Sequence, residues 1–204
     1  MKKLYSLALI LAAVAAVAAA VRTTSKTRPA RDAGATVALG SVVEDFTLPD
    51  ADGREHTLAS LKGAKGTVII FMATQCPVSN AYNERMQKLN EDYASRGVNV
   101  VGINSNVREL AAEVKKHAAE KGLKFTILKD TGNVIADRFD AQYTPETYLL
   151  DASGKLVYHG RIDNSRAGDS VTATELRDAI DAVLAGKAVE KQEAKAFGCS
   201  IKRG

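Results

Sequence analysis

The segment Thr67–Asn80, TVIIFMATQCPVSN, decides the fold of this chain, because it joins a buried strand to a helix through a cysteine. Residues 68–72 form a short, continuous apolar run, and its length and β-branched content favour a buried strand over a helix. Pro77 suits the first turn of a helix, where an N–H group would lack an intrahelical acceptor. Apolar side chains then recur at helical spacing at Val78, Tyr82, Met86, Leu89 and Tyr93. Cys76 therefore lies where the strand ends and the helix begins.

This position makes Cys76 a candidate nucleophile. Backbone N–H groups and the positive end of the helix dipole stabilise a thiolate there. The pKa of a cysteine in such a setting falls from roughly 8.5 to a value between about 3.5 and 7.5. We therefore predict that the Cys76 sulfur is held in place, accessible and ionised. The alternative interpretation is a small buried hydrophobic residue without chemistry.

Length and composition describe an ordinary globular protein. The 204 residues suffice for one domain with appendages, and 46% of them are hydrophobic and 25% charged. The net charge of +4 comes from interleaved basic and acidic residues, and Trp is absent, so nucleic-acid binding has no support. The sequence has no Gly-rich phosphate loop, no Ser-His-Asp order and no metal-ligand spacing, and we therefore expect no cofactor.

The first residues describe a targeting segment. Lys2 and Lys3 precede an uncharged apolar run, Leu4–Val21, that ends in small residues. This pattern predicts that residues 1–21 are a signal peptide, with an uncleaved membrane anchor as the alternative, since the run is just long enough to cross a bilayer. Either way, we expect the folded part to lie outside the cytoplasm, periplasmic or secreted, where disulfides persist. Residues 22–39 lack periodicity and predict a flexible linker.

The rest of the chain alternates strands and helices. We expect an extended hairpin over 40–63, strands over 98–103 and 125–128, helices over 110–118, 135–139 and 176–184, and a hairpin formed by 147–150 and 156–158. This order predicts an α/β fold with a central mixed sheet and helices on both faces. Functional groups should gather at the carboxyl ends of its parallel strands, with Cys76 at one end and Asn104–Asn106 at another. The tail 187–204 should be frayed, except that residues 197–201 could dock.

Three features resemble the thioredoxin-like superfamily, in its redoxin branch of AhpC/TSA-type (peroxiredoxin-like) and membrane-tethered proteins. Residues 40–63 look like the redoxin N-terminal hairpin. Cys76-Pro77-Val78-Ser79 occupies the place of the thioredoxin Cys-x-x-Cys. Thr144-Pro145, just before the strand TYLLD, looks like the cis-proline loop that packs beside the active-site cysteine. The resemblance spans 40–186, which we expect to form one thioredoxin-like domain.

The departures from the family pattern are informative. Ser79 replaces the second cysteine of the motif, so a resolving thiol must come from elsewhere, and Cys199 is the only candidate in the chain. Two cysteines in an exported chain usually pair, although Cys199 could also be a thiol unrelated to Cys76. Ala73 stands where the peroxiredoxin pattern has a threonine, and Pro145 where that family keeps a catalytic arginine. A peroxidase without that arginine lacks a charged donor aimed at the peroxide.

The resemblance implies a redox enzyme that exchanges thiols and disulfides with partner proteins and is restored by an external thiol reductant. It makes Cys76 and Cys199 catalytic and places Gln75, Ser79, Thr144, Pro145 and Glu146 around the substrate. We expect the Glu146 side chain to be solvated and Arg161 to pair with Asp163. One alternative is a peroxiredoxin-like thiol peroxidase with an antioxidant role and a peroxide as substrate. Another is a non-catalytic module for binding or metal delivery.

Overall fold

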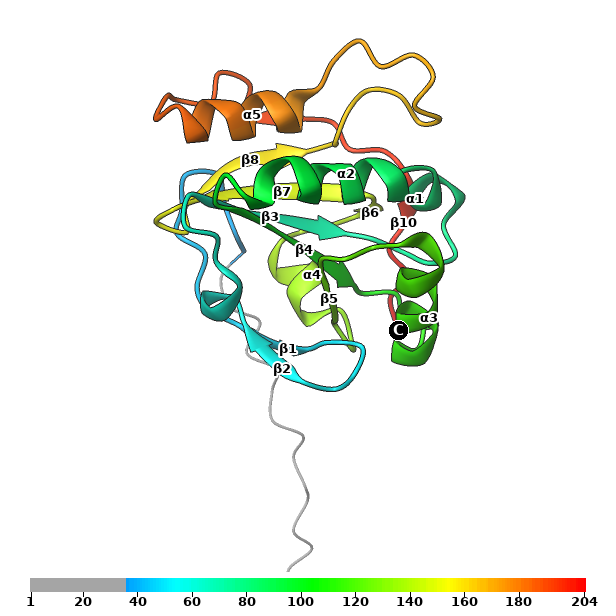
Figure 1. Cartoon of the computed structure of the whole chain (residues 1–204). Coiled ribbons are helices and arrows are strands. Elements are labelled where there is room, and N and C mark those ends of the chain that lie inside the picture. The colour runs from blue at the N-terminus through cyan, green and yellow to red at the C-terminus, as the bar shows by residue number, and fades with distance from the viewer. Residues whose placement is uncertain (1–35) are drawn as a thin grey trace, which may run out of the picture. The chain divides into compact units, whose positions relative to one another are not determined.

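A six-stranded mixed sheet forms the centre of the structure, a computed structural model that describes residues 36–204 (Figure 1). Its strand order is β5–β4–β3–β7–β8–β9. The strands β3 (Gly66–Phe71), β4 (Val98–Asn104) and β5 (Thr126–Lys129) are parallel, and β7 (Glu146–Asp151) and β8 (Leu156–Gly160) continue the sheet antiparallel. The predicted α/β fold with a mixed central sheet is confirmed.

Strand β3 is central because both of its faces are apolar. All six of its residues are buried, as expected for a strand with neighbours on both sides and a core on each face. Val68 and Ile70 face one hydrophobic cluster, while Ile69 and Phe71 face the other. The sheet therefore divides the interior into two cores, and its central strand leads directly to Cys76.

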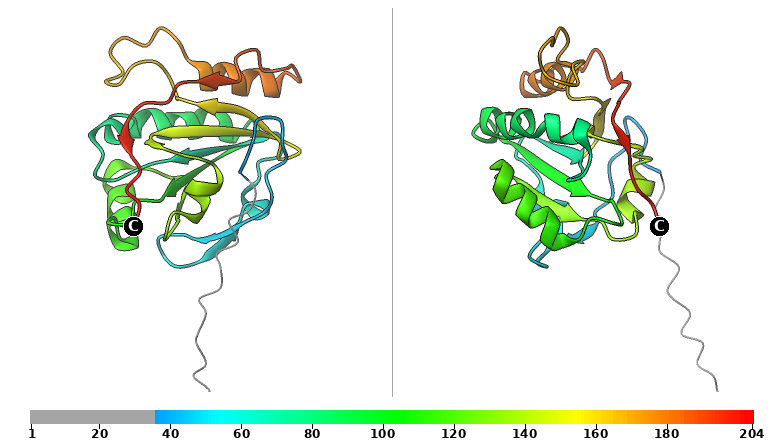
Figure 2. Two further views of the ribbon diagram at one scale, coloured as in Figure 1. Left: turned by 180° about the vertical axis from the view of Figure 1, so that it is seen from behind. Right: turned by 90° about the vertical axis from the view of Figure 1, so that its right-hand side faces the viewer.

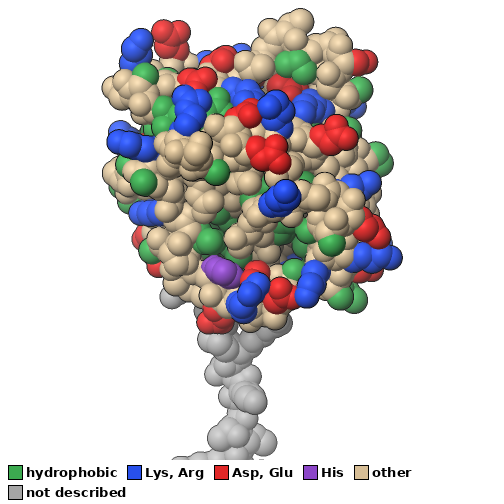
Figure 3. All heavy atoms as spheres, viewed as in Figure 1, with side chains coloured by type: hydrophobic (Ala, Val, Ile, Leu, Met, Phe, Trp, Pro, Cys, Tyr) green, Lys and Arg blue, Asp and Glu red, His purple; other side chains and the backbone are tan. Residues whose placement is uncertain are grey.

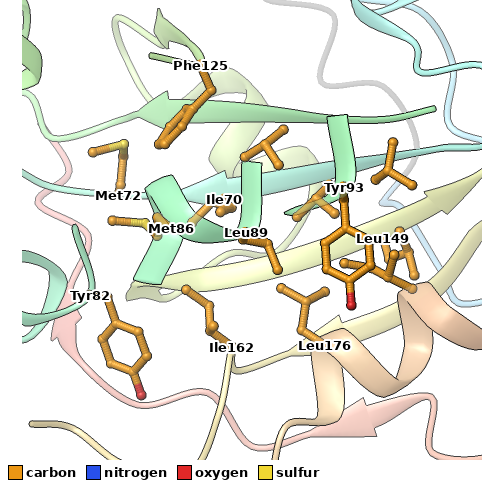
Figure 4. Close-up of a cluster of buried hydrophobic side chains, with 14 of the residues drawn as sticks. Ile70, Met72, Tyr82, Met86, Leu89, Tyr93, Phe125, Leu149, Ile162 and Leu176 are labelled. Atoms are coloured by element: carbon orange, nitrogen blue, oxygen red, sulfur yellow. The ribbon is translucent and has the colours of Figure 1, made fainter. Parts of the chain in front are cut away.

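The two faces of the sheet are covered differently. Helices α2 (Asn83–Ala94), α3 (Ala111–Lys121) and α5 (Glu175–Leu184) pack on the first face, where Met86, Leu89 and Leu176 belong to one cluster with Ile70 and Leu149 (Figure 4). The second face is covered by α4 (Val134–Arg138) and by the hairpin of β1 (Thr47–Pro49) and β2 (Glu55–Thr57), with the short 3-10 helix Ala59–Leu61. The predicted helices on both faces and the N-terminal hairpin are thus present.

The helix that begins at Pro77 is divided in two. It consists of α1 (Pro77–Ala81) and α2, with Tyr82 between them. The Tyr82 N–H donates to Ser79 O at 3.0 Å, a tighter turn than that of a regular α-helix. The ring of Tyr82 is fully buried, and its hydroxyl donates to the Asp163 carboxylate. The sequence predicted one uninterrupted helix here, because the apolar spacing continues through the division.

The C-terminal tail is ordered into two short strands, so the expectation of fraying is wrong. Strand β9 (Glu193–Ala194) pairs parallel with β8, and β10 (Cys199–Ser200) pairs antiparallel with β6 (Tyr143–Thr144). Figures 1 and 2 show the tail, in red, passing α5 and running on beyond β10 to the C-terminus; β10 itself lies beside α1 and β6. The predicted docking of residues 197–201 is confirmed. The tail has no periodic apolar face, but four of its apolar side chains are buried individually: Val189, Ala194, Ala196 and Ile201.

The predicted signal peptide or anchor, residues 1–21, lies outside the described residues, as does most of the predicted linker. The last linker residues belong to the packed domain, because Val37 and Leu39 pack against the second core and the Val37 N–H donates to Arg138 O at 2.8 Å. Within residues 36–204, no helix has both the length and the apolar character needed to cross a membrane.

Charged side chains of both signs are interspersed on the face of the molecule seen in Figure 3. Ion pairs account for part of this mixture, as where Asp92 contacts both Lys88 and Arg177. This face therefore has no continuous basic stripe of the kind that follows a nucleic-acid backbone.

Candidate active site

Cys76 lies at the junction that the sequence predicted, immediately after the loop that follows β3. It is the N-cap residue of α1, and Pro77 occupies the first helical turn. The Ser79 N–H donates to the Cys76 sulfur at 3.2 Å. The side chain of Cys76 is only 3% exposed, so the sulfur is held in place but is not freely accessible. The prediction of open access is therefore wrong for this conformation.

The cis-proline loop faces Cys76 from β6. The Thr144–Pro145 peptide bond is cis, as the resemblance implied. The Cys76 thiol donates to the Thr144 carbonyl oxygen at 3.3 Å. The predicted neighbours Thr144 and Pro145 thus do lie at the sulfur.

Cys199 is brought to Cys76 by the pairing of β10 with β6, in which Cys199 lies opposite Thr144. Both cysteines are free thiols, and each shifts the pKa of the other, so the two sulfurs lie close together. They line one cavity of about 220 Å³, together with Gln75, Asn106, Arg108, Glu109, Ser200 and Lys202. The tail therefore covers Cys76 with a second thiol.

The surroundings of the two sulfurs shift their pKa values in opposite directions. Burial alone would raise the pKa of Cys76, but its contacts with the Cys199 thiol, the Ser79 N–H and the Thr144 side chain outweigh burial and lower the pKa. Burial raises the pKa of Cys199, and its contact with Cys76 raises it further. These directions favour a thiolate at Cys76 and a protonated thiol at Cys199.

Two buried polar side chains, Ser79 and Glu109, hold the loop that precedes Cys76, residues 73–75. The Ser79 hydroxyl accepts from the Ala73 N–H at 3.1 Å, and Ser79 is fully buried. The Glu109 carboxylate accepts from the N–H groups of Thr74 and Gln75, at 2.8 and 3.1 Å. Burial alone would raise the pKa of Glu109, but these and further hydrogen bonds lower it, which keeps the carboxylate charged.

Asn104–Asn106 reach the same edge of the sheet as Cys76, as predicted. The side chains of Asn104 and Asn106 both donate to Glu109. Sequence reasoning missed Glu109 itself, because it lies in an irregular segment and its role depends on partners from two segments, residues 74–75 and 104–106. The only available signal was its position shortly after a strand end rich in asparagine.

Glu146 is buried, so the expectation of a solvated side chain is wrong. Its carboxylate accepts from the N–H groups of Gln142 and Tyr143, from the Tyr148 hydroxyl and from His159. Burial opposes its ionisation, but the hydrogen bonds from His159 and the loop lower its pKa. Glu146 therefore fixes the cis-proline loop from within. We assign Ser79 and Glu146 to the support of the site, instead of the substrate contact that the resemblance implied.

Arg161 forms an ion pair with Glu175, and Asp163 pairs with Arg85 instead. The predicted pairing of Arg161 with Asp163 is wrong, because the segment after Asp163 brings α5 back against Arg161. Within residues 36–204, no group of three or more His, Cys, Asp or Glu side chains is placed to hold a metal ion.

Similarity to known proteins agrees with this geometry. The model of the AhpC/TSA family matches residues 39–159. The thiol-disulfide oxidoreductase ResA of Geobacillus thermodenitrificans is 34% identical over 120 residues, which are 59% of this chain and 67% of ResA. A putative chloroplastic peroxiredoxin Q from Oryza sativa subsp. indica is 31% identical over 129 residues, 60% of this chain and 58% of that protein. The crystal structure of a hypothetical protein from Sinorhizobium meliloti superposes with a TM-score of 0.77 at 37% identity, covering 83% of this chain and 96% of that one.

The fold, the cis-proline loop and the cysteine at the end of the central strand define a thioredoxin-like redox protein. The family match extends over more than half of the chain. The chain belongs to the AhpC/TSA family and is a redoxin enzyme.

Proposed function

We propose that this protein is a thiol–disulfide oxidoreductase in which Cys76 attacks a partner disulfide and Cys199 resolves the product. The observation that carries the proposal is that both thiols line one cavity, with Cys199 paired opposite the residue that the Cys76 thiol contacts, Thr144. The opposite pKa shifts assign the roles, since the thiolate forms at Cys76 and the proton remains on Cys199.

The reaction proceeds by two exchanges. The Cys76 thiolate attacks one sulfur of the partner disulfide, whose S–S bond breaks, and the other partner sulfur leaves as a thiolate. Cys199 then loses its proton, to the departing thiolate or to water, and attacks the Cys76 sulfur of the mixed disulfide, whose S–S bond breaks as the second partner sulfur leaves as a thiolate. The two partner thiolates take up two protons, equal in number to those that Cys76 and Cys199 gave up, and the protein is left with a Cys76–Cys199 disulfide. An external dithiol returns the pair to the reduced state.

The burial of Cys76 sets a condition on the first exchange. Because the tail lies over the sulfur, β10 must move away from β6 before a protein disulfide can approach. The same movement back delivers Cys199 to the mixed disulfide. We propose that Thr144, Pro145 and Gln75 then border the partner chain, since their backbone lies beside the sulfur.

The test is the redox state and activity of two single variants. Oxidation with glutathione disulfide should give a Cys76–Cys199 link in the wild type, seen as an internally linked peptide pair by non-reducing mass analysis. Cys76→Ser should abolish reduction of insulin disulfides, and Cys199→Ser should accumulate mixed disulfides at Cys76. Two free thiols in the oxidised wild type, or full activity of Cys76→Ser, would overturn the proposal.

A thiol peroxidase reaction is the second candidate, favoured by the placement of the exposed Arg108 in the cavity with both sulfurs and by the likeness to peroxiredoxin Q. In that reaction the Cys76 thiolate attacks a peroxide oxygen, the O–O bond breaks, and the other oxygen takes up a proton and leaves as water or an alcohol. The resulting sulfenic acid condenses with the Cys199 thiol to give the disulfide and water. Disulfide exchange is the stronger candidate, because Pro145 occupies the place of the catalytic arginine. Stoichiometric peroxide consumption with a sulfenic acid trapped in Cys199→Ser would reverse this order.

We further propose that the protein works outside the cytoplasm. The proposal rests on the sequence of residues 1–21, with Lys2 and Lys3 before an apolar run that ends in an Ala-x-Ala pattern. Cell fractionation should recover the protein outside the cytoplasm, and the N-terminal sequence of that fraction should show whether the segment has been removed. Recovery with the cytoplasmic proteins would contradict the proposal.

A further inference from the structure

A single buried carboxylate organises the residues that precede Cys76. Glu109 is 1% exposed, and its two oxygens accept four hydrogen bonds. One oxygen accepts from the Thr74 N–H and the Asn104 amide, and the other from the Gln75 N–H and the Asn106 amide. Such a carboxylate fixes the loop firmly, because it is charged and losing it would leave the part-buried N–H groups of Thr74 and Gln75 and the buried amides of both asparagines without their acceptor.

Asn106 extends this network to the tail that carries Cys199. Its amide nitrogen donates to Glu109 at 2.8 Å, and its amide oxygen accepts from the Lys202 N–H at 2.8 Å. The neighbouring Val107 N–H donates to Lys202 O at 3.1 Å. Lys202 is thus held through both of its backbone polar groups, three residues beyond Cys199.

Lys129 fixes the orientation of the two asparagines. Its buried ammonium group donates to the Asn104 side-chain oxygen and to the Asn106 carbonyl, both at 2.7 Å. The amide nitrogen of Asn104 is thereby turned toward Glu109. The network contains an acid, a base and two amides, and most of its hydrogen-bonding groups have partners, as a buried polar network requires.

We infer that Glu109 and Asn106 are positioning residues that hold the loop of Cys76 and the tail of Cys199 in register. The inference rests on the proposed exchange reaction, in which the two sulfurs must form a bond. Neither side chain has a hydrogen bond to a sulfur, so each acts through the backbone it holds. Their role is to raise the effective concentration of Cys199 at Cys76.

The experiment equilibrates the full chain with mixtures of reduced and oxidised glutathione and measures the fraction of Cys76–Cys199 disulfide after acid quenching and alkylation. Asn106→Ala removes the side-chain bonds to Lys202 and to Glu109, and leaves the Glu109 bonds to Thr74 and Gln75 in place. It should lower the effective concentration about fivefold. Glu109→Gln replaces one acceptor by a donor that faces N–H groups, and should lower it about tenfold or more.

The matched control is Glu113→Gln in the first turn of α3, the helix that follows Glu109. The Glu113 carboxylate is exposed and accepts from the Leu110 N–H at 2.9 Å, and it holds neither the Cys76 loop nor the tail. This variant should stay within about twofold of the wild type. A second readout is the pH profile of Cys76 alkylation in a Cys199→Ser background, which Asn106→Ala should leave unchanged because the bonds to the Cys76 loop remain.

The outcomes separate the two proposals. A wild type that forms no disulfide would refute the proposed function itself. A normal wild type with an equally stable disulfide in Asn106→Ala would overturn only the positioning role. A shifted alkylation profile in Asn106→Ala would also overturn it, since the effect would then act on the Cys76 thiol alone. If Glu109→Gln fails to fold, Asn106→Ala decides the question.

Discussion

Replacing Gly198 with alanine tests how closely the tail must approach Cys76. A Cβ atom at this position would lie 2.1 Å from Thr144 O and 2.7 Å from the Thr144 carbonyl carbon. Both are backbone atoms, so no flexible side chain can move aside. The backbone of β10 must therefore withdraw from β6 by roughly 1 Å to reach an ordinary contact distance.

The magnitude follows from the hydrogen bonds that this shift weakens. The Ile201 N–H donates to Gln142 O at 2.9 Å, and the Thr144 hydroxyl donates to Cys199 O at 3.5 Å. At about 0.5–1.5 kcal/mol each, their loss costs about 1–3 kcal/mol. Since about 1.4 kcal/mol is tenfold in an equilibrium constant, the effective concentration of Cys199 at Cys76 should fall about 5- to 150-fold.

The assay is the glutathione equilibrium of the Cys76–Cys199 disulfide, with Gly204→Ala as the control. A Cβ at Gly204 would lie 3.7 Å from the nearest Val107 side-chain carbon, an ordinary contact, so this variant should behave as the wild type. Equal disulfide stability in Gly198→Ala and Gly204→Ala would refute the argument that the pairing of β10 with β6 places Cys199.

Three further predictions concern charge and chemistry. Cys199→Ala removes the neighbour that lowers the pKa of Cys76 most, so the alkylation profile of Cys76 should move to higher pH, and an unchanged profile would contradict the assignment. Ser79→Cys supplies a second thiol one helical turn from Cys76, so it should increase insulin reduction, measured by turbidity. The double variant Ser79→Cys, Cys199→Ser should keep this activity, and an inactive double variant would count against the prediction. Burial would raise the pKa of Glu175, but hydrogen bonds, the first of them from Arg161, lower it from 4.5 to about 2. The stabilisation of the folded protein by the Glu175 carboxylate is therefore complete above about pH 4.5 and is lost as the pH falls through about 2. Denaturant unfolding should show that the free energy of unfolding falls between pH 5 and pH 2 by about 3 kcal/mol more in the wild type than in Glu175→Gln. An equal fall in both proteins would exclude the effect.

The parts of the site that depend on local signals could be predicted from the sequence. Strand β3 is a continuous apolar run, Pro77 marks the helix start, and the position of Cys76 between them follows. The cis bond before Pro145 and the docking of residues 197–201 were also expected. Each of these features has a sequence signal that spans only a few residues, so the residue pattern or the family resemblance was enough to predict it.

The remaining features depend on contacts between distant segments. Strands β6, β9 and β10 have two residues each and exist only because a partner strand lies beside them. The tail's burial of Cys76 follows from that pairing, so a short motif around the cysteine could not reveal it. Glu109 takes its role from the backbone of Thr74 and Gln75, about 35 residues earlier in the chain. No local pattern records such a contact.

The antiparallel pairing of β3 with β7 has a practical consequence for attaching the protein to a surface. Gly66 lies opposite Asp151, so the turn at Ala152 and Ser153 sits at the end of the sheet remote from Cys76. The length of β3 alone puts it about 20 Å away. Both turn residues are exposed. An immobilisation handle inserted there would present the sulfur pair to the solution. The handle should not be attached through a thiol, because the same reagent would also modify Cys76 and Cys199, the chain's two cysteines.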